Sequence, residues 1–205
     1  RDYTLLTLPL AARLDRRNSA TNASAGYFLN VETTPFYDTT NDLFGSRFFA
    51  DARAYRSFGA GDKFTFAGRA QFGSVIGAMI ENTPADFLFY SGGGGTVRGQ
   101  TYKTLGIDSV IAGEDLRTGG QSFVGAQLEA RYAVTDKIGL VGFYDFGQIG
   151  ADASFGGKIN WHAGVGMGLR YNTGIGPIRL DIATPASGDN IASSVQVYIG
   201  IGQTF

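Results

Sequence analysis

The chain has 205 residues, a formal net charge of −1 and no cysteine. The near-neutral charge gives no electrostatic footprint for nucleic acid, and the lack of cysteine excludes disulfide frameworks and cysteine-based metal sites. No stretch approaches the ~20 consecutive apolar residues of a membrane-spanning helix, because Asp145 interrupts the most apolar run, Gly139 to Phe146. From its length we expect a single domain.

Apolar and polar residues alternate along almost the whole chain, a pattern that predicts an all-β fold with antiparallel strands. Nine strands are expected, at 4–14, 26–36, 47–58, 63–76, 122–132, 138–147, 161–172, 176–183 and 195–205. Short turns at 59–62, 135–137 and 172–174 alternate with long connections at 77–121, 148–160 and 185–194. This alternation is typical of an outer-membrane β-barrel, whose short turns face the periplasm.

The segment 161–172 shows the strand pattern most clearly. One face is wholly apolar and is bracketed by Trp161 and Tyr171, whereas the opposite face is polar or carries no side chain. At ~3.3 Å per residue and a tilt of ~40°, the two aromatic rings are roughly 25 Å apart, which is the height of a barrel's apolar band. Trp and Tyr also favour the membrane interfaces. The segment therefore predicts a transmembrane strand.

The alternation further predicts which side chains face lipid and which face the barrel interior, here called the lumen. A lipid-facing charge near mid-membrane costs ~2–4 kcal/mol, whereas a lumen charge is solvated or paired. The polar residues expected in the lumen are Arg69, Gln127, Glu129, Asp145, Arg170, Arg179 and Asp181. Phe205 would share the apolar face of the last strand, at its periplasmic edge. A soluble β-sandwich is the alternative fold, but a small core could not bury so many apolar faces.

Nine strands do not match the even number of single-chain bacterial barrels. An open edge in lipid would leave backbone amides unsatisfied, at a cost of several kcal/mol each. We therefore expect an incomplete portion of a larger barrel, or pairing with another chain or copy. The chain begins at Arg1 rather than methionine, which indicates a mature form or an excised fragment.

Enzymatic chemistry has little support. The one histidine, His162, lies on the polar side of a predicted strand, where an ordinary lumen residue is the favoured interpretation. No nucleophile-elbow motif and no cluster with metal-ligand spacing is present. The glycine-rich run 92–99 lacks the Lys-Ser/Thr ending of a phosphate-binding loop, and no helix follows it. We expect no catalysis, no cofactor and no metal.

Several segments, taken in order, resemble one family. The stretch 90–99, Tyr-Ser-Gly-Gly-Gly-Gly-Thr-Val-Arg-Gly, resembles the "GGxxSVRGY" loop of the BamA/TamA superfamily, also called the bacterial surface antigen family. The segments 125–132, 143–147 and 174–183 look like the strands that follow this loop, and a terminal Phe205 completes the set. The four-glycine run and the Gly-Pro-Ile-Arg-Leu-Asp segment look more like TamA than BamA. Gln100 departs from the pattern, because the family usually has an aromatic residue there.

The resemblance implies a barrel of about sixteen strands behind periplasmic POTRA domains, of which this chain would be the C-terminal nine strands. It implies a bacterial outer-membrane location and a role in inserting β-barrel proteins or autotransporters, or in passing chains across the membrane. The implied partners are outer-membrane lipid, unfolded outer-membrane protein substrates and a TamB-like periplasm-spanning protein. The alternatives are a two-partner-type secretion channel, a passive porin, or the membrane anchor of an outer-membrane esterase.

The connection 77–121 is much longer than a passive link requires, and such loops are usually functional or disordered. It contains an apolar patch, 87–90, that would be costly to leave in water. We expect the loop to fold back into the lumen and to cover this patch.

Within this loop we expect Arg98, flanked by Val97 and Gly99, to dock on Glu129 and Asp145. Alternation places both carboxylates on the lumen face of neighbouring strands, and a planar guanidinium can bond both at once. The alternative from the residues alone leaves Arg98 in solvent and pairs Glu129 with Arg131 or Arg170. The resemblance, in which this loop arginine pairs with lumen acids, favours docking. It also implies that Phe205 is the C-terminal assembly signal.

Overall fold

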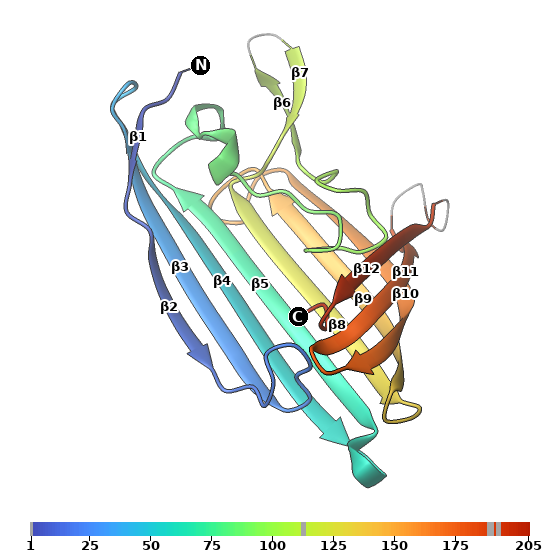
Figure 1. Cartoon of the computed structure of the whole chain (residues 1–205). Coiled ribbons are helices and arrows are strands. Elements are labelled where there is room, and N and C mark those ends of the chain that lie inside the picture. The colour runs from blue at the N-terminus through green and yellow to red at the C-terminus, as the bar shows by residue number, and fades with distance from the viewer. Residues whose placement is uncertain (1, 112–113, 188–190, 192–193) are drawn as a thin grey trace.

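The main feature of the structure, a computed structural model, is one large antiparallel sheet (Figure 1). Residues 2–111, 114–187, 191 and 194–205 are described. The sheet strands are β1 (Leu5–Thr7), β2 (Leu10–Asp15), β3 (Gly26–Asp38), β4 (Leu43–Phe58), β5 (Phe64–Ile76), β8 (Ser122–Ala133), β9 (Ile138–Gly150), β10 (Ile159–Thr173), β11 (Gly176–Pro185) and β12 (Gln196–Ile201). From β3 onward each strand pairs with the next strand of the sheet, while β1 and β2 both pair with β3 as one interrupted edge strand.

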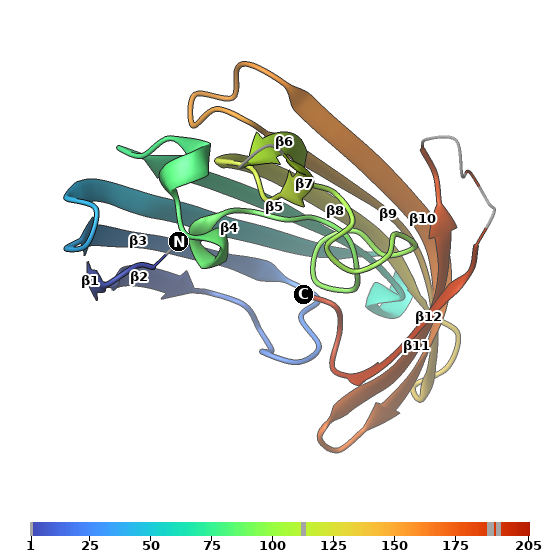
Figure 2. The ribbon, with the colours of Figure 1, turned by 90° about the horizontal axis from the view of Figure 1, so that it is seen from above.

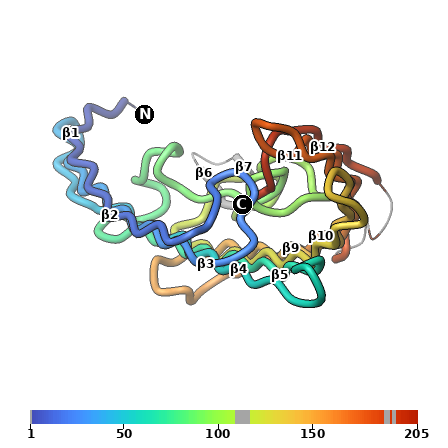
Figure 3. The backbone as a smooth tube through the Cα atoms, turned by 60° about the horizontal axis from the view of Figure 1, so that its bottom comes forward, coloured from blue at the N-terminus to red at the C-terminus, as the bar shows by residue number. Residues whose placement is uncertain are grey.

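The sheet curls into an open trough (Figure 2). The connection from β5 to β8 lies on its concave side, and the C-terminus lies on the same side (Figure 3). Within the described residues no pairing joins β12 to β1 or β2, so the sheet does not close. None of the helical turns in the described part of the chain is long or apolar enough to cross a membrane.

The strand register separates two kinds of surface. Leu128, Tyr144 and Val165 are cross-strand neighbours on the convex face, where large apolar side chains are exposed. The adjacent row on the concave face contains Gln127 and Asp145, which are buried under the β5–β8 connection. The concave face also holds the other polar residues predicted for the lumen. The convex face is therefore the lipid-facing wall, and the alternation predicted these faces correctly.

Two predicted strands extend further than expected. β3 continues to Asp38 and β4 begins at Leu43, so that only residues 39–42 join the two strands. The Asp38 carboxylate accepts hydrogen bonds from the backbone amides of Thr40, at 3.0 Å, and of Thr4, at 3.2 Å. Such an Asx turn reverses the chain tightly. The expected alternation of short and long connections is therefore not strict, because this short turn lies at the long-loop end of the sheet.

The last strand ends earlier than predicted. β12 stops at Ile201, and Gly202, with φ of +86°, turns the chain towards the concave face. Phe205 is only 5% exposed and packs against Tyr55, with ring centroids 6.3 Å apart. The predicted strand to residue 205, with Phe205 on the lipid-facing edge, is therefore wrong. Glycine at 202 permits this turn because a left-handed backbone carries little strain there.

The β5–β8 connection has structure of its own. The described part of the chain has three 3-10 turns, η1 (Ala60–Asp62), η2 (Ile80–Asn82) and η3 (Ala85–Phe87), and the latter two lie within this connection. A hairpin that the sequence did not predict, β6 (Ile107–Ile111) and β7 (Glu114–Thr118), extends past the strand ends (Figure 1). Only part of the connection therefore folds against the concave wall.

Candidate functional site

The candidate site is a buried charge cluster where the β5–β8 connection meets the concave wall. Arg98 is its centre and is only 1% exposed. The chain approaches through a tight turn in which the amide of Gly93 donates to the carbonyl of Val97 at 3.0 Å. It leaves through Gly99, whose φ is +89°. A Cβ there would lie 2.6 Å from the carbonyl carbon of Thr184, so glycine lets the loop touch β11.

Arg98 and Asp145 form the most complete contact of the cluster, with three hydrogen bonds. The Arg98 Nε donates to Asp145 Oδ2 at 2.7 Å, and Nη2 donates to Oδ1 at 2.9 Å. The backbone amide of Arg98 also donates to Oδ2, at 3.0 Å. The pair is therefore bidentate and charge-assisted, the strongest class of side-chain hydrogen bond.

The remaining guanidinium nitrogen, Nη1, reaches three more groups. It donates to Glu129 Oε1 at 2.7 Å and to Thr204 Oγ1 at 3.0 Å, and it lies 3.3 Å from Asp181 Oδ2. The cluster therefore joins β8, β9, β11 and the C-terminal segment to one loop residue. The expected contacts with Glu129 and Asp145 are both present, and Asp181 and Thr204 are partners that the sequence did not indicate.

Two further arginines balance the charges. Arg131 donates to Glu129 Oε2 through Nε at 2.8 Å, and Arg170 bonds Asp181. Glu129 thus takes both the expected loop partner and the alternative partner on its own strand. Since all three acids are no more than 2% exposed, each needs its cation. The cluster contains three guanidinium groups and three carboxylates, so its formal charges cancel.

The charged form of the Arg98 guanidinium is stabilised by its surroundings. Burial alone would lower the pKa of Arg98, but the adjacent Asp145 and Glu129 carboxylates outweigh burial and raise that pKa above its ordinary value. The guanidinium carbon lies 3.5 Å from the centroid of the Phe143 ring, a cation–π contact. Arg98 therefore stays charged under all ordinary conditions, and the cluster is suited to fastening the loop rather than to proton transfer.

Glycines in the wall make room for the loop. A Cβ at Gly164 would collide with the carbonyl oxygen of Arg98, and a Cβ at Gly147 would lie 2.9 Å from a methyl of Val97. His162, the register partner of Gly147, shares a 2.9 Å hydrogen bond with Ser91 Oγ. The glycines of the wall, which carry no side chain, therefore form part of the surface against which the loop packs.

The apolar patch of the connection is covered. Leu88 and Phe89 are 6% and 4% exposed, and Phe89 stacks on Phe123 with ring centroids 6.0 Å apart. Arg47 of β4 donates to the carbonyl of Phe87 at 3.1 Å and lies 4.3 Å from the Phe89 ring centroid. A second, apolar anchor therefore holds the loop against β4, β5 and β8.

A model of the Omp85 superfamily domain matches residues 1–205. The chain belongs to the Omp85 superfamily. A solved structure similar to this Omp85 chain is that of BamA from Haemophilus ducreyi lacking POTRA domains 1–3. The TM-score is 0.72 and the sequence identity is 16%, and the match covers 94% of this chain and 40% of that one. The family resemblance predicted from the sequence is thus confirmed, and the Omp85 chain is part of a β-barrel of the bacterial outer membrane.

The described residues of the Omp85 chain contain no group of three or more His, Cys, Asp or Glu side chains placed to hold a metal ion. Gln100, where the family resemblance predicts an aromatic residue, donates through Nε2 to the carbonyl of Ala163 at 2.8 Å. The amide therefore ties the loop to β10 by a polar contact in place of ring packing.

Proposed function

We propose that this Omp85 chain is the C-terminal barrel portion of an outer-membrane factor that inserts β-barrel proteins or autotransporters into the membrane. Omp85 membership supports a role in barrel assembly or translocation in general. The finer assignment, a factor more like TamA than BamA, draws on the glycine-rich loop 92–95 and the segment 176–181. The match to BamA covers 40% of that chain, so activity, substrates and partners of the whole protein are part of this proposal.

The observation that carries the proposal is the link from the loop to the end of the sheet. Besides the Arg98 contact with Thr204, the amide of Gly99 donates to the Tyr198 hydroxyl of β12 at 3.1 Å. β12 has a partner on one side only within the described residues. A strand with one free edge is the natural place for the wall to open and for another strand to pair.

The role we propose for the Arg98 cluster is to brace the wall while this edge is free. The loop is fastened to β8, β9 and β11 through carboxylates, and these fastenings do not depend on what pairs with β12. The edge can therefore exchange partners without collapse of the trough. No small cofactor is needed, because strand pairing and apolar burial supply the driving force.

Depletion of the full-length protein in its source bacterium tests the function. The amounts of autotransporters and of other β-barrel proteins in the outer membrane are expected to fall. Unchanged amounts would contradict the insertase proposal, and loss of one dedicated secreted protein alone would favour a two-partner-type channel. Recovery of a TamB-like protein by cross-linking to the full-length protein would test the proposed partner separately.

A further inference from the structure

One charged side chain of the main sheet lies on the lipid-facing wall. The charged residues of its described strands are Arg13, Asp15, Glu32, Asp38, Arg47, Asp51, Arg53, Arg56, Arg69, Glu129, Arg131, Asp145, Arg170, Arg179 and Asp181. All except Arg56 belong to the concave rows. Arg56 instead pairs in register with Phe66, which pairs with Ala130 on the next strand, both in the convex rows.

Arg56 has no anionic partner in the described part of the chain. Its one electrostatic contact among the described residues is a cation–π contact, in which the guanidinium carbon lies 5.3 Å from the centroid of the Phe58 ring. The side chain is exposed and lies two residues before the end of β4, next to the short β4–β5 turn. A lipid-facing cation is tolerated near the membrane interface, where a long side chain can reach the head groups.

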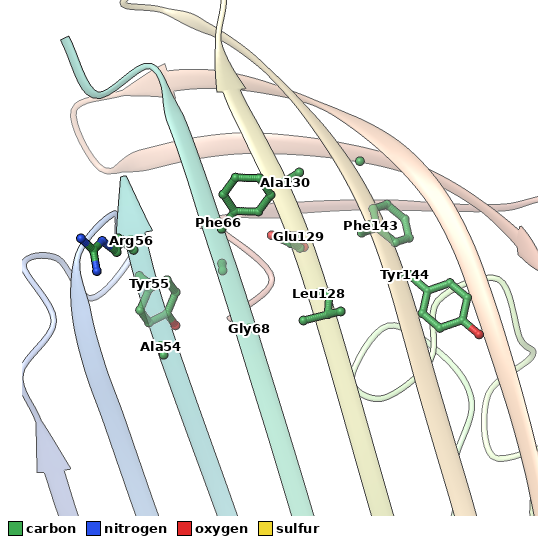
Figure 4. A pocket seen from close by; sticks show the side chains of 12 residues that line it. Ala54, Tyr55, Arg56, Phe66, Gly68, Leu128, Glu129, Ala130, Phe143 and Tyr144 are labelled. Atoms are coloured by element: carbon green, nitrogen blue, oxygen red, sulfur yellow. The ribbon is translucent and has the colours of Figure 1, made fainter. Parts of the chain in front are cut away.

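An apolar groove begins at Arg56. It has a volume of about 710 Å³ and crosses β4, β5, β8 and β9. Figure 4 shows Phe66, Leu128 and Tyr144 around a floor that includes Gly68, with Arg56 at the margin on β4. A second apolar hollow of about 480 Å³ shares Ala130 and Gly142 with the first and continues towards β11.

The glycine at 142 is not required by the protein's own packing. A Cβ at Gly142 would meet nothing within 4 Å, in contrast to the wall glycines that receive the loop. The groove is therefore an unfilled depression in the outer surface, and it is open to whatever surrounds the barrel. In a membrane the surrounding molecules are lipids.

We propose that this groove is a binding site for an anionic phospholipid, with an acyl chain along the groove and the phosphate on Arg56. Charge complementarity selects the occupant, because the groove is apolar along its length and ends at one unpaired cation. An arginine is suited to phosphate, since its planar fork can bond two oxygens. The position beside a short turn places the site in the periplasmic leaflet on the orientation expected for such turns.

The test uses the full-length protein reconstituted in nanodiscs. Two probes carry the same photoreactive diazirine acyl chain, one with a phosphatidylglycerol and one with a phosphatidylcholine head group. Labelled peptides are identified by mass spectrometry. Phosphatidylglycerol is expected to label segments 54–68 and 128–144 in preference to phosphatidylcholine. Equal labelling by the two probes would overturn the proposal, because it would show bulk lipid contact only.

The Arg56→Gln variant should lose the preference by about fivefold, the factor that one cation near a membrane surface contributes. Arg56→Lys should keep part of it. Lys137→Gln, which removes an exposed cation at another short turn, is the matched control and should keep all of it. A preference that survives Arg56→Gln would overturn the proposal.

Two further experiments test the position of the acyl chain and the source of the phosphate separately. Gly142→Leu should fill the groove and reduce labelling of segment 128–144 by both probes, while the heat-modified electrophoretic mobility confirms an intact barrel. Unchanged labelling in this variant would exclude the groove as the chain's position. Excess glycerol phosphate should not displace the phosphatidylglycerol probe; displacement would show a site for a soluble phosphate and contradict the lipid assignment.

Discussion

Arg98 and Asp145, which are 47 residues apart in the chain, share three hydrogen bonds of 2.7 to 3.0 Å, one of them from the Arg98 backbone amide. The amide contact means that the carboxylate fixes the loop's backbone as well as its side chain. Removing the side chain therefore leaves part of the contact in place, but it leaves the buried acids without their shared cation.

Replacement of Arg98 by alanine should destabilise the docked loop by about 3–5 kcal/mol, because breaking a buried ion pair leaves the remaining buried charges without a partner. Arg98→Lys should recover only part of this, since an ammonium cannot reproduce the bidentate contact. The measurement is limited proteolysis within residues 77–121 of the full-length protein. Arg117→Ala, which removes an exposed arginine paired with Asp108 in the same loop, is the control. Equal protease resistance of Arg98→Ala and the parent would contradict the proposed brace.

Gly164→Ala should displace the loop although it adds only one methyl group. Its Cβ meets the Arg98 carbonyl, and overpacking of a close contact costs about 1–3 kcal/mol. Gly142→Ala adds the same group on the convex face, where nothing lies within 4 Å, and should be nearly neutral. The two variants are compared by the urea midpoint of loop release, followed by a fluorophore attached at residue 102. Identical midpoints would show that the loop does not sit against Gly164.

The assignment of the two faces can be tested with neighbouring residues of β5. Phe66 is 57% exposed on the convex face, whereas Thr65 is 9% exposed on the concave face. Because the chain has no cysteine, spin labels can be attached at Phe66→Cys and Thr65→Cys without background. Oxygen, which dissolves in lipid, should relax the label at 66 more, and a water-soluble nickel chelate should relax the label at 65 more. Equal responses at both sites would refute a membrane-spanning strand.

Phe205→Ala should destabilise the assembled barrel, by up to about 3–5 kcal/mol for loss of a buried ring. The ring lies against Tyr55, and its backbone carbonyl accepts from Arg131 Nη2 at 3.3 Å. Phe44→Ala, at a convex position where the ring is 64% exposed, should cost much less. Unfolding of protein that has already been assembled gives the readout. A Phe205→Ala protein that assembles poorly but is fully stable once assembled would instead assign Phe205 to an assembly signal alone.

The sequence predicted the strands and their faces because both depend on a local pattern. Alternation of apolar and polar residues reports the lipid contact of each strand directly, as for β10 between Trp161 and Tyr171. The short turn between β3 and β4 was missed because it depends on the Asp38 carboxylate rather than on glycine or proline. The β6–β7 hairpin was missed because its strands are short and lie within a long connection.

The docking of Arg98 was partly predictable. Glu129 and Asp145 are on adjacent strands, so alternation alone brings them close. Asp181 and Thr204 approach Arg98 only because the sheet curls, and no local pattern encodes that curvature. A usable signal was nevertheless present: Gly147 and Gly164 leave gaps in the wall opposite the loop. The inward turn of Phe205 depends on Gly202, which a continuous alternation pattern conceals.

The partners of Arg98 also constrain the order of folding. They lie 31, 47, 83 and 106 residues further along the chain. Contacts of such wide sequence separation form late, after the loops between them have closed. The last of them, Thr204, lies 106 residues after Arg98, so the set is complete only when the chain as far as Thr204 has joined the sheet. A chain that stops before Thr204 would hold the loop with fewer hydrogen bonds, and its loop would be more open to proteases. The cluster thereby distinguishes chains whose C-terminal segment has docked from chains in which it has not.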